Sequence, residues 1–146
     1  MSFIPQDAQW YVADILEEIR VEGDPRNVVH RNTVLIKADS PEDAYAKSIM
    51  LGKEGELEYS NPGGRQVRIV FRGLADLNVI HGELKHGAEL FYTEKIGVPE
   101  EEIKRLIQTK DGLAVFRETK KSTGPDYSPK EIMDQLDQAL YPNRKR

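Results

Sequence analysis

The sequence predicts an α+β fold with an antiparallel sheet of about four to six strands, a helix after the second strand, and helices at the C-terminal end. Apolar and polar residues alternate along several segments of the first half, which is typical of strands that bury one face. A Pro-Gly-Gly turn joins two of these segments, and a strong helix-start signal follows another. Together these observations favour strands packed around a helix.

Length and composition limit the class of protein. The 146 residues match one domain, and 38% hydrophobic with 32% charged residues are typical of a globular protein. No apolar stretch reaches the ~18 residues of a membrane span, and we expect no signal peptide. The absence of cysteine excludes disulfides and thiol chemistry and favours a cytoplasmic location. The net charge of −4 argues against broad nucleic-acid binding.

Residues 10–22 fit both a helix and a strand. Four apolar residues follow the helical spacing, and a set of five residues that shares two of these four lies on one face at a period of two. The two sets are Val12, Ile15, Leu16 and Ile19, and Tyr11, Ala13, Ile15, Ile19 and Val21. The aromatic start and the β-branched content favour a strand, and no capping residue stands just before Trp10. We therefore predict a strand.

A second strand and a helix follow. Residues 30–38 alternate and are rich in β-branched side chains. Ser40 can cap a helix, Pro41 suits its first position, and two acidic residues come next. We expect Gly52 to end this helix. Its predicted apolar stripe consists of Tyr45, Ile49 and Met50.

A hairpin comes after the helix, and its register follows from which side chains must share a face. A two-residue turn at Pro62–Gly63 would set Leu57 opposite Arg68 and mix the faces, so we predict a three-residue loop, 62–64. The predicted cross-strand pairs are Leu57 with Ile69, Glu58 with Arg68, and Tyr59 with Val67. We expect a positive φ at Gly64.

The second half is predicted less sharply. We expect a loop with a helical turn at 73–87 and a strand at 89–96. Residues 97–102 are predicted to open a helix that runs through Gln108, with an apolar stripe of Ile103, Leu106 and Ile107. Residues 112–118 suit either a short strand or an extension of that helix. Residues 1–118 would then form one α+β domain.

Residues 119–127 are predicted to be a polar linker to a C-terminal helix at 128–142. Ser128, Pro129 and Glu131 form a capping box with proline at the first helical position. Three apolar residues spaced by four would face a partner surface, in this subunit or another. They are Ile132, Leu136 and Leu140.

Several short motifs in this order resemble an uncharacterised bacterial family, domain of unknown function 4288. The motifs are residues 10–13, 38–44, Gly52, residues 61–63, 71–77 and 86–90. The resemblance covers roughly residues 9 to 95. It implies a small bacterial protein with strands around a helix, and it brings no activity, substrate or cofactor.

The densest reactive chemistry lies in the segment 81–89. His81, Glu83, His86 and Glu89 offer imidazoles and carboxylates that could hold a divalent metal or act as general acid and base. No metal-ligand spacing matches, no nucleophile lies nearby, and a polar surface loop explains these residues more simply. A small metal-dependent enzyme or hydrolase is thus an alternative hypothesis, with His81 and His86 as its candidate metal ligands.

A basic sheet face supports a further alternative, the binding of RNA or a phosphate ligand. Arg31, Lys37, Arg68 and Arg72 could align on neighbouring strands. A cross-strand ion pair between Glu58 and Arg68 is the simpler explanation.

The leading hypothesis is a non-enzymatic binding or accessory module without a cofactor. A small sheet with one covering helix leaves a face or an edge strand available to a second copy or another protein. The candidate interaction residues are Trp10, Arg68, Arg72, Ile132, Leu136 and Leu140. We expect a homodimer or a complex with another protein, and no membrane partner.

Overall fold

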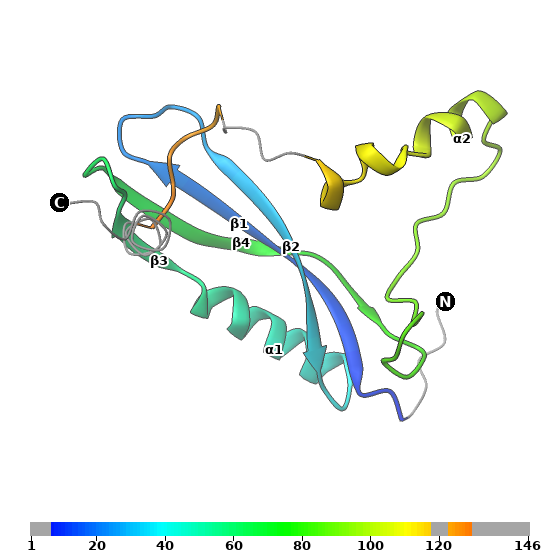
Figure 1. Ribbon diagram of the computed structural model, residues 1–146. Helices are drawn as coiled ribbons and strands as arrows, with labels where there is room; N and C mark the ends of the chain where they lie inside the picture. The colour runs from blue at the N-terminus through cyan, green and yellow to red at the C-terminus, as the bar shows by residue number, and fades with distance from the viewer. Residues whose placement is uncertain (1–6, 118–122, 130–146) are drawn as a thin grey trace, which may run out of the picture. The chain divides into compact units, whose positions relative to one another are not determined.

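The structure is a computed structural model that describes residues 7–117 and 123–129 (Figure 1). The chain divides into two compact units: the first runs to Phe91 and resumes at Gly124, and the second is Tyr92–Thr123. In the first unit, the elements are β1 (Trp10–Val21), β2 (Val28–Lys37), α1 (Pro41–Glu54), β3 (Leu57–Ser60) and β4 (Gln66–Val79). The second unit contains α2 (Glu100–Leu106) and two 3₁₀ turns, Lys110–Gly112 and Ala114–Phe116.

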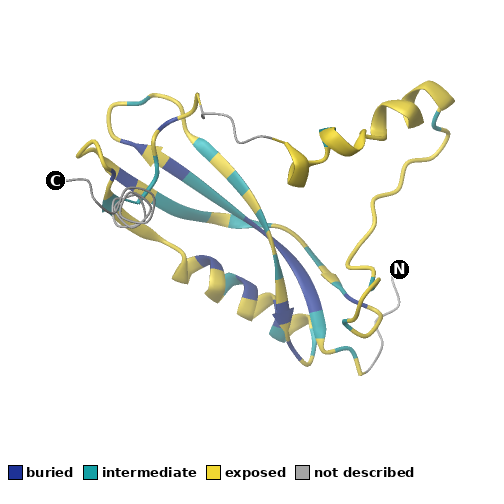
Figure 2. Cartoon of the chain, in the orientation of Figure 1, coloured by how far each residue is buried: buried dark blue, intermediate teal, exposed yellow. Residues whose placement is uncertain are grey.

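The four strands form one sheet in the order β2-β1-β4-β3, with every neighbouring pair antiparallel. The α+β class, the strand at the start of the chain and the helix after the second strand are confirmed. The central strand β1 is the most buried of the four, as Figure 2 shows. β2 and β3 are the two edges of this sheet.

Side chains alternate between the two faces of the sheet. We call the face that carries Tyr11, Ala13, Ile36 and Leu77 the helix face, because these residues pack against Ala44 of α1. The opposite face carries Asp14 and its partners on the other strands, and we call it the charged face. On the helix face, a second cluster of Ile19, Val21 and Val67 lies toward the other end of β1.

The start of α1 follows the predicted capping pattern. The backbone N–H of Asp43 donates to the Ser40 hydroxyl at 3.1 Å, and proline occupies the first turn. This bond satisfies one of the N–H groups that a helix start leaves free.

The predicted end of α1 and its predicted buried stripe are wrong. The helix continues to Glu54, and Gly52 is buried inside it. Tyr45 and Met50 are more than half exposed. The buried residues are instead the small ones at intervals of four, namely Ala44, Ser48 and Gly52. Small side chains let the helix axis come close to the sheet, and large apolar ones would hold it away.

The hairpin between β3 and β4 has the predicted register. Its pairs are Leu57 with Ile69, Glu58 with Arg68, and Tyr59 with Val67. The Asn61 N–H donates to the Arg65 carbonyl at 2.9 Å, so the loop is the predicted 62–64. The Gly64 N–H donates to the Asn61 carbonyl, and Gly64 has φ +81°. The prediction of a positive φ is therefore confirmed.

The loop with a helical turn predicted at 73–87 is wrong in its first half, because β4 extends to Val79. Its whole length pairs with β1, with two irregularities opposite Asp14/Ile15 and Leu16/Glu17. Gly73, beside one of them, has φ +139°. Leu74 and Leu77, three residues apart as on one side of a helix, thus lie in a strand, because a bulge shifts which residues of the strand face the core.

The strand predicted at 89–96 is also wrong: residues 89–95 have no regular structure and are exposed. The predicted helix is confirmed only as the shorter α2, and the described residues 112–117 form neither a strand nor an extension of it. The predicted stripe of Ile103, Leu106 and Ile107 is exposed. A single strand or short helix without a packed neighbour cannot bury such residues.

Candidate functional site

The outer edge of β2 is the most extended unpaired stretch of backbone in the described sheet. The Ala38 N–H donates to the Gln9 carbonyl at 2.9 Å, and the pairing of β1 with β2 has no register shift. Hydrogen-bonded pairs alternate in an antiparallel ladder. The even-numbered residues of β2 therefore bond to β1, and the N–H and C=O groups of the odd-numbered residues point outward.

Four residues of β2 present free backbone groups at this edge. They are Val29, Arg31, Thr33 and Leu35, and we call them the β2 edge. Among the described residues, their outward backbone groups have no partner. The Lys37 carbonyl, by contrast, accepts a hydrogen bond from the Lys47 ammonium at 2.8 Å. The lysine of α1 therefore ends the free edge at one side.

The side chains of the β2 edge are exposed as well. Val29 is 57% exposed and Leu35 is 48% exposed, although both are apolar. No proline and no bulge interrupts the strand. Edge strands that avoid association are usually short, bulged, or protected by proline and inward-pointing charge. The other edge, β3, has only four residues, whereas β2 has ten.

Asp14 organises the charged face beside this edge. Its carboxylate accepts hydrogen bonds from the Thr33 hydroxyl at 2.7 Å and from Arg31 Nε at 2.8 Å. The hydrogen bond from Thr33 lowers the pKa of Asp14, and Arg31 adds to the effect, against the opposing effect of burial. The ionised carboxylate thus holds two side chains of the edge in place.

Glu18 is a second acidic centre on the charged face. The Asn27 amide donates to its carboxylate at 2.6 Å, and Arg20 and Arg72 lie 3.3 and 3.7 Å from it. The hydrogen bond from Asn27 lowers the pKa of Glu18, with smaller contributions from the two arginines. Arg72 therefore balances a carboxylate on its own sheet.

The arginines singled out for a basic face each have an acidic neighbour. Arg68 Nε lies 3.5 Å from Glu58, directly across the β3–β4 pair, and Arg31 pairs with Asp14. The cross-strand ion pair between Glu58 and Arg68 is confirmed. Lys37 lies 5.9 Å from the ring centroid of Trp10, its partner across β1 and β2. RNA or phosphate binding by this face stays a prediction.

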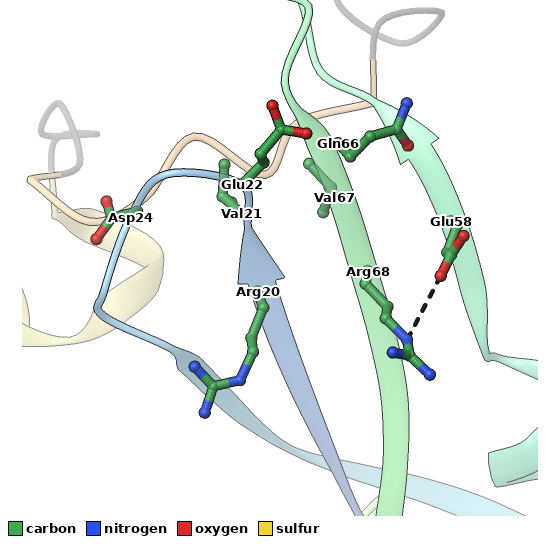
Figure 3. A pocket seen from close by; sticks show the side chains of 8 residues that line it. All are labelled: Arg20, Val21, Glu22, Asp24, Glu58, Gln66, Val67 and Arg68. Atoms are coloured by element: carbon green, nitrogen blue, oxygen red, sulfur yellow. Dashed lines mark ion pairs between the residues drawn. The ribbon is translucent and has the colours of Figure 1, made fainter.

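A shallow hollow of about 530 Å³ lies where β1 ends and β4 begins, beside β3 and the loop after β1 (Figure 3). Figure 3 shows the ion pair that joins Arg68 and Glu58, two of the residues that line the hollow. The charged residues that line the hollow are Arg20, Arg68, Glu22, Asp24 and Glu58. Acidic groups outnumber basic ones, which disfavours an anionic ligand.

The four candidates of the segment 81–89 are all exposed. His81 and Glu83 line a hollow of about 360 Å³ together with Asp7 and Trp10, but His86 and Glu89 do not line it. Among the described residues, no three His, Cys, Asp or Glu side chains come together as a metal ion requires. Acid–base chemistry by His81 and Glu83 stays a prediction.

Residues 10–92 match the family described as Domain of unknown function (DUF4288). The chain belongs to this family. The predicted resemblance is thereby confirmed, and the matched segment begins at the first residue of β1 and takes in the whole sheet with α1. No curated protein and no solved structure matches the chain significantly.

Beyond the DUF4288 segment, the described residues 123–129 include contacts that sequence reasoning missed. The Asn61 amide donates to the Asp126 carbonyl at 2.9 Å, and the Tyr59 hydroxyl donates to the Tyr127 carbonyl. The Tyr127 ring meets the ring of His30 edge-on at 5.5 Å. Pro125 is buried. The polar linker at 119–127 was predicted from Lys120, Lys121, Gly124 and Pro125, a composition that gives no sign of these contacts.

The DUF4288 chain leaves two other predictions open. Trp10, a candidate interaction residue, is half-buried at the start of β1. Ile132, Leu136 and Leu140 lie outside the described residues, as does the C-terminal helix predicted for them. Within the described residues, no helix is long and apolar enough to cross a membrane.

Proposed function

We propose that this protein is a non-enzymatic binding module that forms a homodimer through the β2 edge. The observation that carries the proposal is the exposed row of Val29, Arg31, Thr33 and Leu35, whose outward backbone groups have no partner among the described residues. Such a row is a template on which another strand can add, because each new strand satisfies N–H and C=O groups along its length.

The side chains support a protein partner over a small ligand. Val29 and Leu35 are exposed apolar residues on one face of an edge strand, where a neighbouring strand would cover them. Arg31 and Thr33 lie between Val29 and Leu35 in β2, and both donate hydrogen bonds to the carboxylate of Asp14. The edge is therefore already ordered before a partner binds. An ordered edge loses less conformational entropy on binding than a mobile one.

The electrostatics of the charged face also favour a binding role. The carboxylates of Asp14 and Glu18 are held ionised by hydrogen bonds and by neighbouring arginines, as in structural ion pairs. General acid catalysis near neutral pH needs the opposite, a carboxyl whose pKa is raised by burial. The site therefore supports recognition rather than proton transfer.

The test is the mass of the full chain in solution, measured by gel filtration with light scattering. We expect the wild type to have twice the mass of one chain. Leu35→Lys should weaken the dimer at least tenfold, about 1.4 kcal/mol, because it places two lysines in the paired edges.

Leu57→Lys is the matched control. Leu57 is 50% exposed on the other edge strand, close to the 48% of Leu35, and its substitution should leave the dimer unchanged. A wild-type protein that remains a single chain at high concentration would contradict the proposal. Equal weakening by both variants would remove β2 from the interface.

A further inference from the structure

We propose that the two copies pair through β2 in one defined antiparallel register, with Asn32 facing its own counterpart across the twofold axis. This inference rests on the homodimer proposed above and specifies which residues meet. A twofold interface is self-complementary. In an antiparallel pair of identical strands, the numbers of two residues that face one another therefore always add up to the same sum. The structure restricts that sum in two independent ways.

The first restriction comes from the backbone. Free outward groups lie at Val29, Arg31, Thr33 and Leu35, and the next outward carbonyl, at Lys37, is already bonded to Lys47. The centre of the free stretch is Asn32. A twofold axis there sets every free outward residue opposite another one, and each pair exchanges two hydrogen bonds.

The second restriction comes from the side chains. With the axis at Asn32, Val29 lies opposite Leu35 of the partner subunit on the charged face. On the helix face, Val28 lies opposite Ile36 of the partner subunit. One apolar pair thus forms on each face, His30 lies opposite Val34 of the partner subunit, and Arg31 meets Thr33 of the partner subunit rather than a like charge.

The neighbouring registers fail one of these restrictions. An axis at Arg31 sets the two guanidinium groups directly opposite one another, which is unfavourable. An axis at Thr33 sets Val29 opposite Lys37 of the partner subunit, whose carbonyl already has a donor. Slipping by one residue would set outward groups of one strand against inward groups of the other.

In the proposed register, the two four-stranded sheets become one continuous sheet with β2 and its copy at the centre. Val29 and Leu35 are exposed in the single chain. In the dimer, Val29 of each copy would be covered by Leu35 of the partner subunit. The short strands β3 would then be the only edges of the described sheet. That arrangement removes the long unprotected edge, as natural sheets generally do.

Pairs of single-cysteine variants test the register, because the chain has no cysteine of its own. Val29→Cys and Leu35→Cys chains are mixed under reducing conditions, oxidised, and resolved on a non-reducing gel. Directly opposite residues have Cα atoms ~5.5 Å apart, which a disulfide can span. We expect a cross-linked dimer in the mixture.

Each variant alone is the first control. In the proposed register, a cysteine at position 29 lies roughly 20 Å from the same position in the other copy, because six residues of strand separate them. Neither variant alone should cross-link. Mixtures of Val29→Cys with Thr33→Cys and of Val29→Cys with Lys37→Cys report the registers centred at Arg31 and Thr33.

The outcomes separate this inference from the proposed function. Cross-linking in either control mixture, without cross-linking in the mixture of Val29→Cys and Leu35→Cys, would overturn the register and leave the β2 dimer standing. A dimer by light scattering that cross-links in none of these mixtures would overturn both the register and the β2 interface. A single chain by light scattering would overturn the dimer itself.

Discussion

Gly52 of α1 lies against the ring of Phe71 on β4 with no room for a side chain between them. A Cβ added at Gly52 would lie 2.4 Å from Cδ1 of Phe71. We predict that Gly52→Ala lowers the free energy of unfolding by about 1–3 kcal/mol, although alanine favours helices, because the clash outweighs the propensity gain. Urea unfolding measures this change. Adding Phe71→Leu should restore part of the loss, and no such rescue would place the cost elsewhere.

The same contact shows why the buried face of α1 was hard to predict. Hydrophobicity favours Tyr45, Ile49 and Met50 as the buried stripe, yet Ala44, Ser48 and Gly52 face the sheet. The only available signal was a small residue at every fourth position. How close a helix lies to a sheet depends on the opposing surface, here Phe71, which is distant in sequence.

The hairpin was predictable for the opposite reason, because its determinants are local. The turn residues 62–64 and the alternation on either side fix the register without information from elsewhere. The extent of β4 and the outer edge of β2 depend instead on strand order. Both follow from the long antiparallel pairing with β1, which no short stretch of sequence reveals.

Asp14 should make stability sensitive to acid. Its pKa is lowered from the ordinary value of 3.8, with the hydrogen bond from Thr33 as the largest cause. A lowered folded-state pKa means that the contribution is complete above pH 3.8 and is lost as the pH falls through the folded-state value. We predict that, as the pH falls below 3.8, the free energy of unfolding decreases less steeply in Asp14→Asn than in the wild type. Equal slopes in both proteins would contradict this role.

The contact between Tyr59 and the Tyr127 carbonyl should order the described residues 123–129. Tyr59→Phe removes the hydroxyl donor at a partly buried site, and we expect a loss of about 1 kcal/mol. Amide hydrogen exchange should accelerate around Tyr127 in the variant. Leu57→Phe, an exposed change on the same strand, is the control. Unchanged exchange in Tyr59→Phe would show that Asn61 and Pro125 hold this segment without it.

The Tyr59 phenol should also titrate late. Burial raises its pKa above the usual 10.0, and the carboxylate of Asp126 adds to the effect. The neutral phenol is thus favoured in the folded state, so its contribution is complete below pH 10.0 and is lost as the pH rises through the folded-state value. Ultraviolet titration of the wild type against Tyr59→Phe measures this difference. A phenol that titrates at or below pH 10.0 would contradict it.

The segment 81–89 should bind no metal ion. His81 and Glu83 share a hollow, but His86 and Glu89 do not line it, and an ion needs at least three converging ligands. Elemental analysis of the purified chain should find no stoichiometric zinc, and a chelator should leave the melting temperature unchanged. His81→Ala with His86→Ala should behave like the wild type in both measurements. Stoichiometric metal that disappears in this variant would reinstate the metal-dependent enzyme.

Proline at two adjacent positions of β2 tests which backbone groups point outward. Val34 lies opposite Ala13, and its N–H belongs to the ladder with β1, whereas the Leu35 N–H points away. Proline removes the N–H in each case. We predict that Val34→Pro costs about 1–3 kcal/mol of stability, as expected for a lost ladder bond. Leu35→Pro should remain folded but monomeric, because only the pairing with the second copy needs its donor. Chemical unfolding at low protein concentration together with light scattering separates the two effects. If Leu35→Pro were the more destabilising variant, the even-numbered residues of β2 would be the ones whose backbone groups point outward.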